Sequence, residues 1–124
     1  MNELTLIDTS AWIEFFRGRE PLASKVDELL ARDLAATCGI VELELVAGLR
    51  KGEEDYVLEQ LGAVTRLLTL EDDYLQTGFK LKTLRARGIT VPATDALIHQ
   101  VATRHGSKVL AKDNHFAHFD PQTS

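Results

Sequence analysis

The chain has 124 residues, which is enough for one domain with a real hydrophobic core but too few for two. Hydrophobic residues make up 44% of the sequence, yet no apolar stretch approaches the roughly 20 residues of a membrane span, so we expect no membrane segment. The first residues lack a basic segment followed by an apolar one, so the sequence predicts no secretory signal and a cytoplasmic location. The net charge of −5 argues against a general nucleic-acid coat, and the single cysteine, Cys38, excludes an internal disulfide.

Strand-like and helix-like stretches alternate along the chain. The apolar run Leu4–Ile7 predicts a buried strand, and Thr9–Arg17 predicts the helix that follows it. Periodicity and turn residues then predict a helix from Pro21 to Leu30, a strand over Leu34–Thr37, helices over Gly39–Leu49 and Glu53–Leu61, a strand over Val64–Leu70, helices over Glu71–Arg87 and Thr94–His105, a strand over Lys108–Ala111 and a short fifth strand near Phe119. We expect Thr94 to be the N-cap of its helix.

This alternation predicts an α/β fold. Strands that read as near-continuous apolar runs are typical of a parallel sheet that is covered on both faces. Right-handed crossover connections place helices on the two faces of such a sheet. The sequence therefore predicts a single domain over residues 1–124, a three-layer α/β/α sandwich around a parallel sheet of about five strands.

Four acidic residues follow, or lie close behind, the ends of predicted strands. Asp8 follows the first strand and Asp113 follows the fourth, while Asp95 lies in the first turn of its helix and Glu44 about one turn into another. The carboxyl ends of parallel strands meet at one edge of the sheet, which is where α/β proteins bind ligands. We therefore expect these four carboxylates to converge there.

Each acid also has a local interpretation. A carboxylate in a first helical turn gains about 0.3–1 kcal/mol from the helix dipole, and an Asp after a strand often only forms a turn. A cluster is different, because two carboxylates about 5 Å apart repel by roughly 3 kcal/mol at an effective dielectric constant near 20. Such a cluster must take up protons or bind a cation, and hard oxygen ligands favour Mg²⁺ or Mn²⁺.

Helix geometry distinguishes between two neighbouring glutamates. Glu42 and Glu44 are two residues apart, about 200° around a helix, so both cannot face one site. Gly48 shares a face with Glu44 and permits close approach, so we take Glu44 as the ligand and Glu42 as peripheral. We expect Thr9 or Ser10 to cap the first helix and to hold the Asp8 carboxylate, or a water bound to it, by hydrogen bonds.

The stretches LIDTSAW, ELVAG, TDALI and VLAKDNHF occur in this order over nearly the whole chain. Together they resemble the PIN-domain ribonucleases, most closely the VapC-type toxins of toxin–antitoxin pairs. The resemblance implies a five-stranded parallel sheet and an endoribonuclease that uses Mg²⁺ or Mn²⁺, with Asp8, Glu44, Asp95 and Asp113 as its acidic positions and Thr9 and Ser10 as the hydroxyls beside the first. It also implies a homodimer and a cognate antitoxin. Ala111 stands where relatives often carry Thr or Ser.

We therefore hypothesise cation-assisted hydrolysis of RNA phosphodiesters. Three alternatives stay open: a phosphatase or phosphotransferase with Asp8 as nucleophile, a receiver-like domain phosphorylated on Asp, and a catalytically silent PIN-like scaffold. The phosphotransferase would want a second Asp where Ser10 stands. Cleavage that is sensitive to EDTA would support the nuclease, whereas acyl-phosphate labelling would support the Asp-based alternatives. We expect His99, one turn after Asp95, to be a surface or supporting residue.

Overall fold

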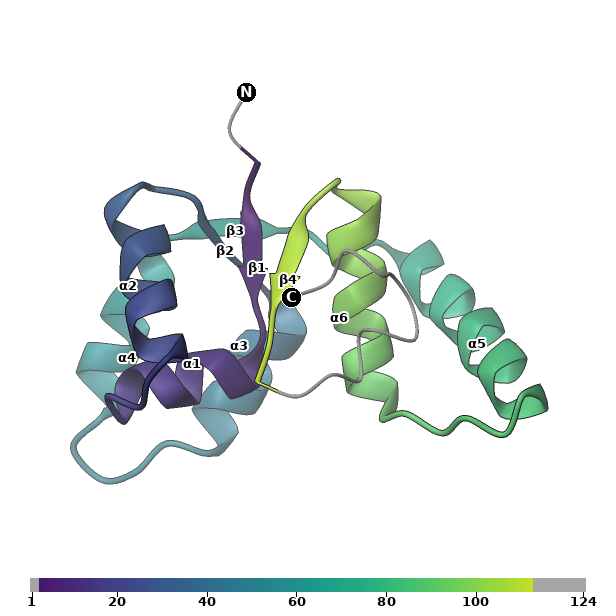
Figure 1. Cartoon of the computed structure of the whole chain (residues 1–124), viewed down its shortest axis with the longest axis horizontal. Helices are drawn as coiled ribbons and strands as arrows, with labels where there is room; N and C mark the ends of the chain where they lie inside the picture. The colour runs from purple at the N-terminus through teal and green to yellow at the C-terminus, as the bar shows by residue number, and fades with distance from the viewer. Residues whose placement is uncertain (1–2, 113–124) are drawn as a thin grey trace.

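The computed structural model describes residues 3–112, and its helices and strands occur in the predicted order (Figure 1). They are β1 (Thr5–Ile7), α1 (Thr9–Phe16), α2 (Leu22–Ala31), β2 (Ala35–Cys38), α3 (Gly39–Ala47), α4 (Glu54–Gly62), β3 (Thr65–Leu67), α5 (Glu71–Ala86), α6 (Ala93–Arg104) and β4 (Lys108–Leu110). In this part of the chain none of the helices has the length and apolar character that a membrane crossing requires.

The four described strands form one parallel sheet in the order β3-β2-β1-β4. Leu6 of β1 lies opposite Ala36 of β2 on one side and Val109 of β4 on the other. The chain adds β2 and β3 on one side of β1 and then returns to add β4 on the other side. Strand order therefore reverses at β1, and the end of β1 is the place where α/β sheets form their sites.

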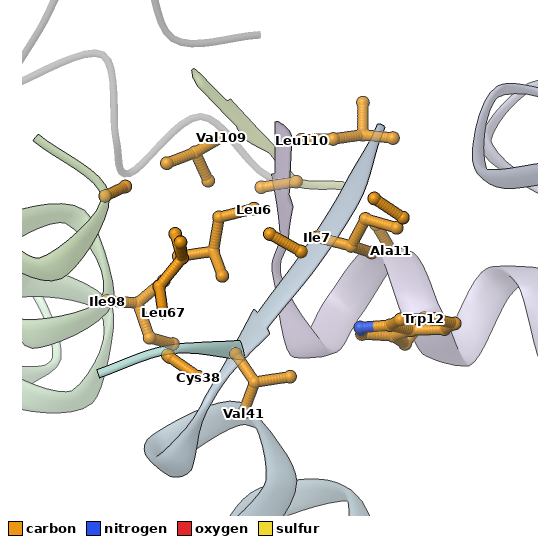
Figure 2. Close-up of a cluster of buried hydrophobic side chains, with 14 of the residues drawn as sticks. Leu6, Ile7, Ala11, Trp12, Cys38, Val41, Leu67, Ile98, Val109 and Leu110 are labelled. Atoms are coloured by element: carbon orange, nitrogen blue, oxygen red, sulfur yellow. The ribbon is translucent and has the colours of Figure 1, made fainter. Parts of the chain in front are cut away.

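Helices cover both faces of this sheet (Figure 1). Helices α1, α2 and α4 lie on one side, and α6 lies on the other with α5 outside it. Side chains of successive strand residues point to opposite faces, so Leu6 packs with Ile98 of α6 while Ile7 packs with Ala11 and Trp12 of α1 (Figure 2). These side chains are completely buried, which explains why the strands read as continuous apolar runs.

The predicted fold class is confirmed, with one adjustment. The structure has four strands within residues 3–112, and the fifth strand predicted near Phe119 lies outside the described residues. The predicted N-cap of α6 is wrong. The backbone leaves the extended conformation at Pro92, which has φ −59° and ψ 140°, so Thr94 already lies inside the first helical turn.

A buried ion pair joins α5 to α6. The Asp73 side chain is 1% exposed and accepts hydrogen bonds from the Leu70 N–H (2.8 Å), from Gln100 Nε2 (3.2 Å) and from Arg104 Nε and Nη2 (2.8 and 3.0 Å). Burial alone would raise the pKa of Asp73, but hydrogen bonds from Arg104, the Leu70 N–H and Gln100 outweigh it and hold this pKa below its ordinary value. The same Arg104 also donates to the Leu68 carbonyl at the end of β3.

The variant Asp73→Asn should lower the free energy of unfolding by about 1–3 kcal/mol at neutral pH, because Arg104 loses its charged acceptor. Asp72→Asn is the matched control: it removes an exposed carboxylate from the same helical turn and should change little. Urea denaturation of both variants measures the difference. Because the folded pKa of Asp73 lies below its unfolded value of about 4, the advantage of the wild type should be complete above about pH 4 and shrink as the pH falls through the folded pKa. An equal loss in both variants would contradict this assignment.

Candidate functional site

Asp8 directly follows β1, at the point where strand order reverses. Its side chain is buried, and its backbone N–H donates to the Leu110 carbonyl of β4 (2.9 Å). Asp8 is also the N-cap of α1, because its Oδ2 atom accepts from the Ser10 N–H (3.1 Å) and from the Ser10 hydroxyl (2.5 Å). The prediction that Thr9 or Ser10 caps the helix is therefore wrong, whereas the prediction that a hydroxyl holds the Asp8 carboxylate is confirmed for Ser10.

The neighbouring hydroxyl binds a different carboxylate. Thr9 Oγ1 donates to Glu44 Oε1 at 2.7 Å, across 35 positions of the sequence. Glu44 lies in α3, the helix that contacts both α1 and α6. Two consecutive hydroxyls at the start of α1 thus hold two carboxylates from separate elements. Hydrogen bonds to charged acceptors are short and strong, so both carboxylates have restricted orientations.

Glu42 is engaged elsewhere. Its Oε1 atom lies 2.8 Å from Arg66 Nη2, in an ion pair between α3 and β3. Glu42 is thus paired with a cation of β3, whereas Glu44 accepts from the Thr9 hydroxyl of α1. The arrangement supports the choice of Glu44 over Glu42 that helix geometry suggested.

Of the remaining two predicted acids, the structure describes Asp95 but not Asp113. Asp95 lies half-buried in the first turn of α6. Asp113 lies outside the described residues, but Lys112 directly before it donates its backbone N–H to the Ser10 hydroxyl at 2.9 Å. Among residues 3–112, no three His, Cys, Asp or Glu side chains gather closely enough to hold a metal ion. The described part of the chain thus does not gather Asp8, Glu44 and Asp95 into such a group, and the convergence of all four acids, which includes Asp113, stays a prediction.

The chemistry of the available donors fits a hard cation. Asp8, Glu44 and Asp95 offer carboxylate oxygens, and the Thr9 and Ser10 hydroxyls orient two of them. The nearest soft donor is Cys38. Burial raises the pKa of its thiol, and the negative charges of Glu42 and Asp8 raise it further, so the thiol stays protonated at neutral pH. Oxygen donors without a thiolate favour Mg²⁺ or Mn²⁺ over Zn²⁺.

Sequence reasoning missed Glu14, and of its two interpretations of His99, surface or supporting residue, the surface one is wrong. Glu14 is buried on α1, where its carboxylate pairs with Arg19 and Lys112, each at 3.2 Å. An acid four residues after Ser10 in the apolar stretch WIEFF is the signal that could have identified it. His99 is buried rather than on the surface, because α6 packs between the sheet and α5, and its Nδ1 lies 3.4 Å from the Thr103 hydroxyl.

Known proteins resemble this chain in sequence and in fold. The model of the PIN domain family matches residues 5–121. VapC ribonuclease Mb1587 of Mycobacterium bovis and Ribonuclease VapC11 of Mycobacterium tuberculosis are each 32% identical to it over 119 residues, which is 91% of this chain and 89% of each relative.

Solved structures share the fold at lower identity. VapBC2 from Rickettsia felis, bound to a DNA fragment from its promoter, has a TM-score of 0.76 at 15% identity and covers 97% of this chain and 96% of its own. A toxin–antitoxin complex from Klebsiella pneumoniae has a TM-score of 0.77 at 17% identity, with coverage of 97% and 95%. These similarities agree with the architecture of the described residues.

The Cys38 thiol should react with Ellman's reagent at pH 8 at least tenfold more slowly in the native protein than after unfolding in urea. Burial and the raised pKa both reduce the amount of accessible thiolate. Because Cys38 is the only cysteine of the chain, the whole absorbance change reports on it. Equal rates in the two states would contradict the burial of this thiol.

Proposed function

Since this chain belongs to the PIN domain family and matches VapC ribonucleases along 91% of its length, we propose that it is a metal-dependent endoribonuclease. Asp8, Glu44, Asp95 and Asp113 would hold Mg²⁺ or Mn²⁺, and RNA phosphodiesters would be the substrate. One observation carries this proposal: the carboxylates of Asp8, directly after β1, and of Glu44, in α3, are held by the consecutive hydroxyls of Ser10 and Thr9 at the place where the strand order reverses.

A bound divalent cation supplies Lewis acidity, which lowers the pKa of water and neutralises charge on the phosphate in the transition state. The protein supplies carboxylates in fixed orientations. Ser10 holds one oxygen of Asp8 through two hydrogen bonds, and Thr9 holds one oxygen of Glu44. Groups that hydrogen-bond a metal-binding side chain in this way typically contribute 10- to 100-fold to metal affinity or activity.

The structure weakens the Asp-based phosphotransfer alternative. A nucleophilic carboxylate has to reach a phosphorus atom in line, whereas Asp8 is 3% exposed and its Oδ2 is engaged by the Ser10 N–H and hydroxyl. A catalytically silent scaffold has no need to orient Asp8 and Glu44 with consecutive hydroxyls. Both arguments favour the nuclease. An assay for an acyl phosphate formed on Asp8 separates the nuclease from the phosphotransfer alternative.

We further propose a cognate antitoxin and a homodimer, with the cytoplasm as the location of the RNA substrate. Two of the structurally similar assemblies are a VapBC2 structure and a toxin–antitoxin complex. Several large apolar side chains are exposed on the helices of this chain, which is typical of surfaces that bind other proteins. They include Leu43 and Val46 on α3, Tyr56 and Leu58 on α4, and Tyr74, Leu75 and Phe79 on α5.

Asp8→Asn should reduce RNA cleavage by on the order of 100-fold or more while the fold survives. Asparagine is as good an N-cap as aspartate, so α1 keeps its acceptor for the Ser10 N–H but the site loses a negative charge. Cleavage of a structured RNA with Mn²⁺ measures the loss, and circular dichroism checks the fold. EDTA should abolish the wild-type activity and excess Mn²⁺ should restore it. Full activity of the variant, or of the wild type in EDTA, would refute the assignment.

Glu44→Gln should reduce cleavage at least tenfold, because the Thr9 hydroxyl would then orient a neutral amide in place of a carboxylate. Glu42→Gln is the matched control, two residues away on the same helix, where only the ion pair to Arg66 is lost. It should retain activity within about twofold, since partly exposed ion pairs contribute little. Titration of each variant with Mn²⁺ by calorimetry gives a second measurement. If the two variants exchange these phenotypes, Glu42 is the site residue.

A further inference from the structure

We propose that Glu14 is a positioning residue of this site: through Lys112 it holds the segment that follows β4, and that leads into Asp113, against α1. The inference rests on the proposed nuclease function, because it concerns the segment that precedes the fourth predicted acid. It assigns a role to a fifth carboxylate that is not a member of the predicted metal site.

Lys112 is attached to α1 at two points. Its backbone N–H donates to the Ser10 hydroxyl (2.9 Å), and its Nζ atom lies 3.2 Å from Glu14 Oε1. Ser10 and Glu14 are four residues apart, so they share one face of α1. The two contacts therefore fix both the backbone and the side chain of Lys112 on that face.

The Glu14 carboxylate is built into the fold. Its side chain is 10% exposed, and its second oxygen, Oε2, lies 3.2 Å from Arg19 Nη1. A charge with so little exposure requires partners. Burial would raise the pKa of Glu14, but hydrogen bonds from Lys112 and Arg19 bring this pKa below its ordinary value, so the carboxylate is ionised at neutral pH.

The Ser10 hydroxyl connects this attachment to Asp8. A hydroxyl has one proton, which Ser10 donates to Asp8 Oδ2, so toward the Lys112 N–H it acts as an acceptor. The hydrogen bonds thus run from Lys112 through Ser10 to Asp8. A shift of Lys112 would move the Ser10 hydroxyl and disturb Asp8, and misplacement by about 1 Å can cost on the order of 100-fold in rate.

The test compares Glu14→Gln, Lys112→Gln and the double variant. Each single variant should lower kcat by about 10- to 100-fold with KM nearly unchanged, and the double variant should be no worse than either single one, since both remove the same contact. Hydrogen exchange followed by NMR should show lower protection of the Lys112 amide in both single variants. Lys112→Gln alters an exposed side chain, so it provides a folded protein even where the loss of Glu14 impairs folding.

Two controls isolate this contact. Arg19→Gln removes the other cation from Glu14 but leaves Lys112 in place, and Glu28→Gln breaks an exposed ion pair with Arg32 on α2. Both should keep kcat and the protection of the Lys112 amide within about twofold, because neither change removes the contact between Glu14 and Lys112.

Other outcomes would overturn the proposal. Additive losses in the double variant would show that Glu14 and Lys112 act separately. A raised KM for Lys112→Gln with an unaffected Glu14→Gln would show that Lys112 binds RNA phosphate instead. Hydrogen exchange does not depend on catalysis, so wild-type protein that fails to cleave RNA would refute the proposed function, while unchanged protection of the Lys112 amide in Glu14→Gln would refute the positioning role.

Discussion

The Ser10 hydroxyl joins two segments of the chain that are about a hundred residues apart, the end of β1 and the end of β4. It donates to Asp8 and accepts from the Lys112 N–H, while the Asp8 N–H donates to the Leu110 carbonyl. This link lies where the strand order reverses. The same hydrogen bonds therefore hold the neighbouring ends of β1 and β4 together and hold Asp8, a candidate ligand, in place. The connection also explains why Asp8 is both a helix cap and a candidate ligand: one carboxylate oxygen satisfies the first turn of α1 and is thereby held in place.

Charge is distributed unevenly around this link. Glu42 and Glu14, which the proposed metal site does not use, are each paired with cations from other elements: Glu42 with Arg66, and Glu14 with Arg19 and Lys112. Glu44 instead accepts from the neutral Thr9 hydroxyl, which orients the carboxylate without cancelling its charge. The described contacts thus distinguish Glu42 and Glu14, which are paired with cations, from Glu44, which is not.

The sequence predicted the order of the elements and the layered fold, because strands such as β1 are buried on both faces and read as apolar runs. Its resemblance to PIN-domain ribonucleases is confirmed by the family match over residues 5–121. The preference for Glu44 followed from helix geometry alone. The partner of Thr9, the burial of His99 and the pairing of Glu14 could not be predicted, since each depends on how elements distant in sequence pack together. The roles of Asp95 and Asp113 as site residues stay predictions.

The short outer strand β3 affects whether the sheets of two molecules can pair edge to edge. It comprises only Thr65–Leu67, and its central residue, Arg66, is charged and bound to α3. Short strands that carry a cation are poor templates for the backbone of a second molecule. Growth of the sheet from one molecule into the next is therefore disfavoured along β3.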